Sequence, residues 1–202
     1  MLRIGLTGGL AAGKSLVAES FRAAGIPVLD ADCIGRELLD TDERLRAAVQ
    51  SAFGLSDAPE KLDRRELARR AFSAPGAQKR LNALLHPAIR AEVNARLRAM
   101  EKNGVERAAV EAALLLEAGL AGDFDAMVLV EAENHDQLER FQARTGLSRE
   151  EAAARLRLQW TNEVKRLRVQ ESGRPFFIIA NRGSRQELSL QAESCVAWLK
   201  SL

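Results

Sequence analysis

The segment Gly8-Gly9-Leu10-Ala11-Ala12-Gly13-Lys14-Ser15 constrains this chain more than any other part of it. It matches G-x-x-x-x-G-K-[ST], in which glycines let backbone N–H groups surround a polyphosphate, the lysine supplies positive charge and the hydroxyl can ligate Mg²⁺. A short apolar run precedes the segment, and apolar residues at helical spacing follow it as far as Gly25. A strand, a glycine-rich loop and a helix in this order bring the positive helix N-terminus to the phosphates. The chain is therefore predicted to bind a nucleoside triphosphate.

Two other nucleotide-binding classes fit less well. A dinucleotide site would use an acid such as Asp30, about 20 residues further on, but G-x-G-x-x-G does not occur in this stretch. A GTPase would use D-x-x-G, which Asp32-Cys33-Ile34-Gly35 imitates too soon after the second predicted strand, and the chain contains no Asn-Lys-x-Asp. An ordinary glycine-rich turn is the remaining alternative.

Composition limits the class of protein. A chain of 202 residues with 47% hydrophobic residues can bury a sizeable core as one domain, and a net charge of +2 gives no electrostatic case for nucleic acid. Cys33 and Cys195 are too few and too isolated for a disulfide framework or a zinc site. The sequence shows neither a signal-like leader nor a run of about 18 apolar residues, so we expect a cytoplasmic protein without a membrane partner.

Alternating apolar and helical stretches predict an α/β fold with a parallel sheet between helical layers. The expected strands are Arg3–Thr7, Pro27–Asp30, Arg107–Leu115, Ala126–Val130 and Phe176–Ala180, and the last expected helix is Glu187–Leu199.

Two helical insertions interrupt this pattern. Residues 39–103 are expected to shape an acceptor pocket with helices Asp42–Phe53, Arg64–Phe72 and Pro87–Glu101 and a loop Gly54–Glu60 broken by Pro59. Residues 135–170 are rich in arginine and are expected to form a helical lid, with Ser148 and Glu151 as a capping box. The nucleotide-binding core would then comprise about residues 1–38, 104–134 and 174–202 of a single domain.

The run Asp30-Ala31-Asp32 follows the second strand. In extended backbone, residues i and i+2 point the same way, so both carboxylates could face one cleft at the carboxyl ends of the strands. A carboxylate there can accept a hydroxyl proton and orient the oxygen for in-line attack on a phosphoryl group. Asp32 is our candidate for this role, while Asp30 is equally well explained as a helix cap or structural acid.

Arginines of the expected lid could clamp phosphate oxygens. Arg140 and Arg144 are an i, i+4 pair on one helix face, and Arg155 and Gln159 have the same spacing on the next helix. The alternative is a solvated charged hairpin with neighbouring glutamates as partners.

Two single residues remain open. His86 precedes a proline predicted to open a helix, and a lone histidine is more often structural. Glu117, expected at the end of the third strand, could bind metal through water or be a loop acid.

The chain resembles the dephospho-CoA kinase family through nearly its whole length. Shared motifs are Ile4-Gly5-Leu6-Thr7-Gly8-Gly9 with Gly13-Lys14-Ser15, Asp30-Ala31-Asp32-x-Ile34-x-Arg36, Leu62-Asp63-Arg64, Leu85-His86-Pro87, Leu114-Leu115-x-Glu117, Gln137-x-x-Arg140-x-x-x-Arg144, Arg155-x-x-x-Gln159 and Ile179-x-Asn181-x-Gly183. The phosphate loop alone occurs in many enzymes, whereas the aspartate pair, His-Pro and the lid arginines in this order are much more specific.

The resemblance implies a three-layer phosphate-loop NTPase fold and ATP-dependent phosphorylation of the ribose 3′-hydroxyl of dephospho-CoA, with Mg²⁺. It places ATP at Gly8, Gly9, Ala11, Ala12, Gly13, Lys14, Ser15, Leu16 and Asn181, with Asn181 near the adenine and Ser15 on the metal. Lys14, Asp32 and Arg140 would be catalytic, and Asp32, His86 and Arg144 would contact dephospho-CoA. We expect a monomer or small homo-oligomer.

The chain departs from the family pattern at several positions. Ala11-Ala12 stands where the family usually has Gly-Ser, Leu16 where it often has Thr, Glu111 and Ala113 where it has Asp and Pro, and Pro175-Phe176 where it has Ala-Asp. Alanine lacks the freedom of glycine at positive φ, so a strained loop is expected. The competing hypotheses are a phosphate-loop kinase for another small alcohol or nucleotide, and a nucleotide-binding module that has lost catalysis.

Overall fold

The computed structural model describes residues 1–55 and 62–202, so most of the predicted loop Gly54–Glu60, including Pro59, lies outside the described residues. Contacts divide the chain into two compact units. The first comprises Met1–Asp30 and Met100–Leu202, and the second comprises Ala31–Ala99. The segment 135–170 thus belongs to the first unit, and the second begins ahead of the boundary expected near residue 39.

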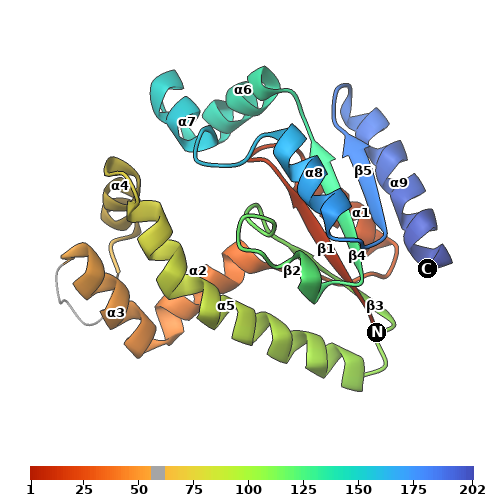
Figure 1. Cartoon of the computed structure of the whole chain (residues 1–202), viewed down its shortest axis with the longest axis horizontal. Helices are drawn as coiled ribbons and strands as arrows, with labels where there is room; N and C mark the ends of the chain where they lie inside the picture. The colour runs from red at the N-terminus through yellow and green to blue at the C-terminus, as the bar shows by residue number, and fades with distance from the viewer. Residues whose placement is uncertain (56–61) are drawn as a thin grey trace. The chain divides into compact units, whose positions relative to one another are not determined.

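The first unit is built on a parallel sheet of five strands (Figure 1). The strands are β1 (Leu2–Gly8), β2 (Val28–Asp30), β3 (Arg107–Glu111), β4 (Ala126–Glu131) and β5 (Phe176–Ala180), in the order β2-β3-β1-β4-β5. Every residue of β4 is buried, which is the pattern of a strand covered on both faces. The predicted α/β class and parallel sheet are confirmed.

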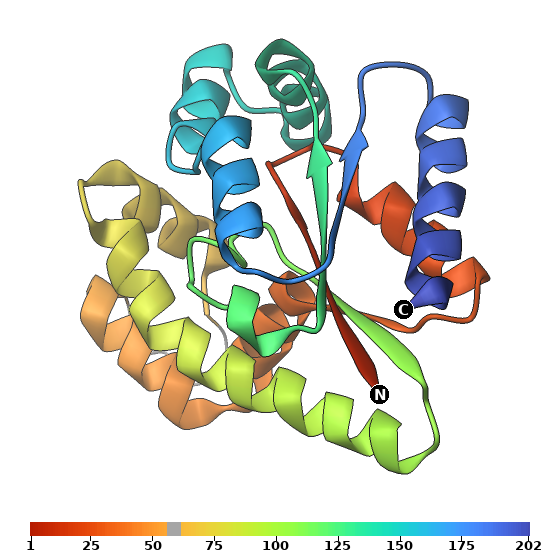
Figure 2. The same cartoon turned by 45° about the vertical axis from the view of Figure 1, so that its right-hand side comes forward.

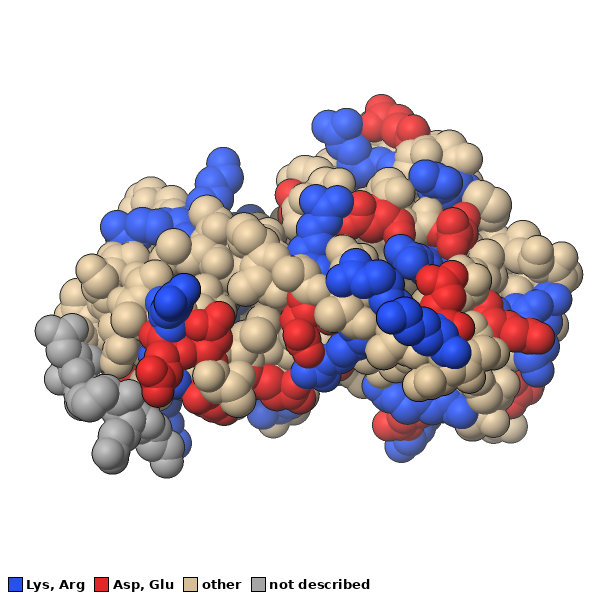
Figure 3. Space-filling model, turned by 90° about the horizontal axis from the view of Figure 1, so that it is seen from below, with Lys and Arg blue, Asp and Glu red and all other residues tan. Residues whose placement is uncertain are grey.

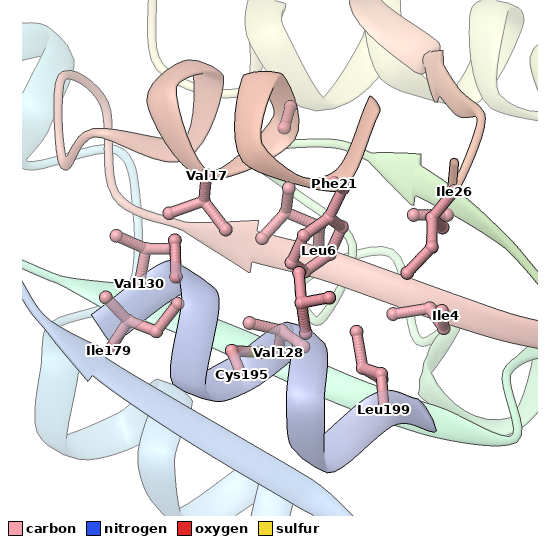
Figure 4. Packing of buried hydrophobic residues seen from close by; sticks show 14 of the residues in the cluster. Ile4, Leu6, Val17, Phe21, Ile26, Val128, Val130, Ile179, Cys195 and Leu199 are labelled. Atoms are coloured by element: carbon pink, nitrogen blue, oxygen red, sulfur yellow. The ribbon is translucent and has the colours of Figure 1, made fainter. Parts of the chain in front are cut away.

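Helices cover both faces of this sheet, as Figure 2 shows, giving three layers. One layer holds α1 (Lys14–Ala23) and α9 (Arg185–Ser201), and α8 (Asn162–Glu171) packs against β4 on the opposite face. Val17 and Phe21 of α1 and Leu199 of α9 belong to one buried cluster with Leu6 and Val128 of the sheet (Figure 4). Burial of a side chain such as Phe21 contributes about 1.5–3 kcal/mol, so this layer fixes the helix that follows the phosphate loop.

The third strand is shorter than predicted. It ends at Glu111 instead of Leu115. Glu111 is opposite Leu6 in β1 and opposite Asp30, the last residue of β2, so β2 offers no partner beyond this point. After one more bond, from the Ala112 N–H to the Leu6 carbonyl, the chain turns, and Leu115 and Leu116 are buried outside the sheet. The apolar run therefore indicated burial, not strand.

The segment after β4 forms α6 (Asn134–Thr145) and α7 (Arg149–Leu156) before it reaches α8. The predicted capping box of Ser148 and Glu151 is present at the start of α7. Between β3 and β4 lies a short 3₁₀ helix, Ala121–Asp123.

The second unit is helical, with α2 (Ala31–Thr41), α3 (Glu43–Phe53), α4 (Arg64–Ser73) and most of α5 (Ala77–Lys102). Asp42 and Asp63 cap α3 and α4 by accepting backbone N–H groups. Its core is formed by the buried residues Leu39, Val49, Phe53, Leu55, Leu62, Leu67, Ala71 and Ala77.

Two local predictions for this unit were wrong. The helix expected to open at Pro87 begins at Ala77, and Pro87 lies inside it. An internal proline costs about 3 kcal/mol. Leu81, Leu84 and Leu85 pack against the core of the unit and offset that cost. Asp32 lies in the first turn of α2, since β2 ends at Asp30 and the helix begins at Ala31. Asp30 and Asp32 therefore do not lie together in extended backbone, as we had expected. Asp30 does occupy the position before a helix.

Surface charge is mixed. Basic and acidic side chains alternate over the face shown in Figure 3, in keeping with the net charge of +2. Within residues 1–55 and 62–202, the helices are too short or too polar to cross a membrane.

Candidate active site

The phosphate loop joins β1 to α1, and its glycines are required by space as well as by conformation. A Cβ on Gly8 would lie 2.2 Å from the Val130 carbonyl oxygen, and one on Gly13 would lie 2.6 Å from the Asn181 amide nitrogen. Gly13 also caps α1 with φ of 106°. Ala11 has φ of 55°, and it is the non-glycine residue with positive φ in the described part of the chain. The backbone strain expected at Ala11-Ala12 is thus present, and it lies at Ala11.

Side chains from three other segments and from the loop itself hold its backbone. The Leu10 N–H donates to Gln159 Oε1 at 2.8 Å, and Asn181 Nδ2 donates to the Ala12 carbonyl at 2.9 Å. Lys14 Nζ donates to the carbonyls of Gly8 and Gly9 at 3.1 and 3.0 Å. Gln137 lies so close to Gly9 that a Cβ there would be 2.2 Å from Gln137 Oε1. Sequence reasoning quoted Gln137, Gln159 and Asn181 as family motif positions, and it did not predict that Gln159 and Asn181 make hydrogen bonds to the loop backbone.

A cavity of about 190 Å³ is lined by Ala11, Ala12, Gly13, Lys14, Ser15, Arg140 and Arg144. The two arginines come from α6, so the structure brings the predicted lid arginines to the predicted phosphate loop. Arg140 Nη1 is buried and makes no hydrogen bond to any described residue, while Nη2 lies 3.6 Å from Asp136 Oδ2. A buried guanidinium nitrogen without a partner beside a loop of N–H donors is a site prepared for an anion.

Glu111, at the end of β3, is a site residue that sequence reasoning noted only as a departure. Ser15 Oγ donates to Glu111 Oε1 at 3.3 Å, and the glutamate is buried. Burial raises the pKa of Glu111, while the positive charge of Lys14 opposes that rise. The usable signal was its place at the end of a strand next to β1, where ligands collect in parallel sheets.

In the second unit, Asp32 and His86 are brought together. Burial lowers the pKa of His86, and the negative charge of Asp32 partly opposes that shift. The helices that carry them, α2 and α5, pack closely, since a Cβ on Gly35 would lie 2.9 Å from Ile89 Cδ1. A histidine with a lowered pKa is neutral at pH 7 and can donate one hydrogen bond and accept another.

We had expected Glu117 at the end of the third strand, but it lies in the turn beyond β3. Its Oε1 lies 2.8 Å from Lys165 Nζ and accepts the Trp160 N–H at 3.2 Å. Lys165 also donates to the Ala113 carbonyl at 3.0 Å, and burial lowers its pKa. The pair ties α8 to the core of the unit. Gln159, expected on a helix with Arg155, lies just beyond the end of α7.

The parallel three-layer fold and the glycine-rich loop at the end of β1 define a protein of the phosphate-loop NTPase fold. The dephospho-CoA kinase family model matches residues 2–185. The chain is 34% identical over 192 residues to a dephospho-CoA kinase of Geobacillus kaustophilus, covering 94% of this chain and 92% of the relative. It is 38% identical over 201 residues to one of Geobacter sulfurreducens, covering 98% and 97%.

Solved structures share the fold of this chain. A crystal structure of a Thermus thermophilus protein has a TM-score of 0.74 at 35% identity, covering 98% of this chain and 97% of that one. A Campylobacter jejuni dephospho-CoA kinase shares the fold with a TM-score of 0.62 at 24% identity, over 98% and 96% of the chains. This chain belongs to the dephospho-CoA kinase family and is an ATP-dependent kinase of coenzyme A biosynthesis.

Proposed function

We propose that this kinase transfers the γ-phosphoryl group of ATP to the ribose 3′-hydroxyl of dephospho-CoA through Lys14, Asp32 and Arg140, giving CoA and ADP. The observation that carries the proposal is the shared cavity in which the phosphate loop meets Arg140 and Arg144. In the reaction, the 3′-oxygen forms a bond to the γ-phosphorus and the bond to the β–γ bridging oxygen breaks. The hydroxyl proton goes to the Asp32 carboxylate.

Lys14 and Arg140 stabilise charge on the transferring group. Lys14 is held over the loop by the carbonyls of Gly8 and Gly9 and would exchange these for phosphate oxygens. Arg140 Nη1 would gain the partner that it lacks among the described residues. Preorganised cations of this kind act where charge develops and need no reorganisation during the reaction.

Ser15 and Glu111 are the residues that would hold Mg²⁺. Their hydroxyl and carboxylate oxygens lie 3.3 Å apart, and Mg²⁺ is typically bound by one or two protein oxygens together with substrate phosphates and water. When bound, the ion would neutralise the β- and γ-phosphates. Its positive charge would also compensate the burial that raises the pKa of Glu111.

The acceptor side is assigned to Asp32 and His86 of the second unit and to Arg144 of α6. Asp32 would orient the 3′-hydroxyl, neutral His86 would position it or the Asp32 carboxylate, and Arg144 would bind acceptor phosphate. Residues 39–103 would receive dephospho-CoA and residues 135–170 would act as the lid. Asn181 supports the loop through its bond to the Ala12 carbonyl. That the segment around Asn181 lies near the adenine of ATP stays a prediction.

Two broader expectations also remain proposals. We propose that the enzyme acts in the cytoplasm, where its two free cysteines, Cys33 and Cys195, would stay reduced. We also propose that it is a monomer or a small homo-oligomer.

The test compares two aspartates of α2. Purified enzyme with ATP, Mg²⁺ and dephospho-CoA should yield CoA and ADP, and Asp32→Asn should lower kcat by about 10²–10⁴-fold with little change in ATP affinity. Asp40 lies on the same helix as Asp32, and Asp40→Asn removes only an exposed ion pair with Arg64 of α4. This variant is the control and should keep normal turnover. Near-normal turnover by Asp32→Asn would contradict the role given to it.

The same assay separates the alternatives. Turnover with other alcohols or nucleotides, but not with dephospho-CoA, would favour a kinase of different specificity. ATP binding without consumption over a panel of acceptors would favour a nucleotide-binding module.

A further inference from the structure

A second cavity, of about 320 Å³, lies against the phosphate loop at Gly9. It shares no residue with the cavity that holds Lys14 and Arg140. Its walls come from α6, from α7 and from residues 157–162, which lead into α8. This volume is at the lower end of the range for small-molecule sites, so the cavity can take one rigid group but not a long flexible molecule.

Four of the lining side chains are amides: Asn134, Gln137, Gln159 and Asn162. Three of them are fixed by the main chain at one end. Gln137 Nε2 and Asn162 Nδ2 donate to the Ala132 carbonyl at 2.7 and 2.8 Å, and Gln159 Oε1 accepts the Leu10 N–H at 2.8 Å. Gln159 Nε2 and Asn162 Oδ1 are thereby kept at set positions, while Gln137 Oε1 lies against Gly9. Amide side chains are the groups that pair with the donor and acceptor edge of adenine.

The remaining walls suit a flat, neutral ring. Apolar surface is supplied by Leu138, Ala153, Leu156 and the indole of Trp160. Among the described lining residues, the charged one is Arg157. No described acidic residue lines the cavity. Nucleobases are bound by this combination of stacking surface and amide hydrogen bonds. A phosphate-rich group would instead need several cations.

We propose that this cavity binds the adenine of dephospho-CoA, an inference that rests on the proposed function. The hydroxyl to be phosphorylated is on the ribose attached to that adenine, so the base must be held within one sugar of the transferring phosphoryl group. A cavity that ends at Gly9 of the phosphate loop meets this requirement. The ATP phosphates would occupy the other cavity, which is lined by the loop residues that follow Leu10. The flexible pantetheine arm then lies outside the cavity.

Filling the cavity tests the proposal. Ala153 lines it, while Ala154, the next residue of α7, is exposed and does not. Ala153→Leu should raise the KM for dephospho-CoA at least about tenfold and leave the KM for ATP within about twofold, because a well-packed site does not accommodate extra methylenes. Ala154→Leu is the matched control and should behave as wild type in both.

The outcomes separate this proposal from the proposed function. Absence of CoA formation by the wild type would overturn the function. An active wild type with equal dephospho-CoA KM values for the two leucine variants would overturn the cavity assignment alone. A rise in the KM for ATP caused by Ala153→Leu would overturn it too, because the cavity would then serve the donor.

A binding measurement decides the matter if Ala153→Leu fails to fold. The chain has two tryptophans, and Trp198 packs against Phe177 with ring centroids 5.5 Å apart, away from the cavity. In a Trp198→Phe variant, emission therefore reports Trp160. Dephospho-CoA should change this emission with saturation, and 4′-phosphopantetheine, which is the acceptor without its adenylate half, should not. Equal responses to the two compounds, or no response to dephospho-CoA at saturating concentration, would overturn the proposal.

Discussion

Two buried lysines in the first unit show how differently one residue type can be used. Lys14 makes hydrogen bonds to carbonyls of its own loop, five and six residues away in sequence. Lys165 joins elements far apart, since it contacts Glu117 and the Ala113 carbonyl from α8. The first arrangement is local and the second bridges the fold. We infer that Lys14 is kept for the charge of a phosphate, and Lys165 for the attachment of α8.

Lys14→Met gives the largest expected effect and tests the first half of this comparison. Loss of a cation at the transferring phosphoryl group should reduce kcat by about 10³-fold or more. The melting temperature should stay within about 3 °C of wild type, since only local bonds are lost. Turnover measured at saturating ATP and thermal unfolding would check both statements. A melting temperature far below that of wild type would show that Lys14 also stabilises the fold.

Lys165→Met tests the second half. Removal of one partner leaves the Glu117 carboxylate buried without its cation, which costs about 3–5 kcal/mol. The melting temperature should fall by on the order of 10 °C, while turnover per folded molecule at low temperature stays close to wild type. Adding Glu117→Leu to this variant should recover much of the loss, because two apolar residues can replace a buried pair. No recovery in the double variant would contradict the ion-pair account.

This contrast also marks the limit of prediction from sequence. The phosphate loop, five strand positions and the Ser148 capping box depend on local pattern, and the structure contains all of them. The length of β3 and the start of α5 were wrong because sheet neighbours and core packing decide them. The Lys165–Glu117 pair and the bond from Leu10 to Gln159 join residues that are 48 and 149 positions apart in sequence. No local pattern encodes such distances, although the resemblance supplied the convergence of Arg140 with the loop.

Asn181 combines the two uses, because it supports the phosphate loop from a distant segment. Asn181→Ala leaves the buried Ala12 carbonyl without its donor, and this should cost about 1–3 kcal/mol. Gln191→Ala is the matched control, since Gln191 bonds both backbone groups of Ala180 but does not contact the loop. Both variants should lower the melting temperature, but only Asn181→Ala should raise the KM for ATP. Equal effects on that KM would show that the bond to Ala12 does not shape the loop.

Ala11→Gly gives the smallest expected effect and measures strain inside the loop itself. Alanine at a φ of 55° costs about 1–2 kcal/mol relative to an ordinary backbone conformation. Glycine removes that cost but loses about 0.5–1 kcal/mol of conformational entropy on folding, so a net gain of up to about 1 kcal/mol is expected, or a few degrees in melting temperature. Ala12 is buried and does not have positive φ, so Ala12→Gly should lower the melting temperature instead. If both glycine variants are destabilised equally, Ala11 stores no strain, and the loop tolerates its alanines because neighbouring segments hold it in place.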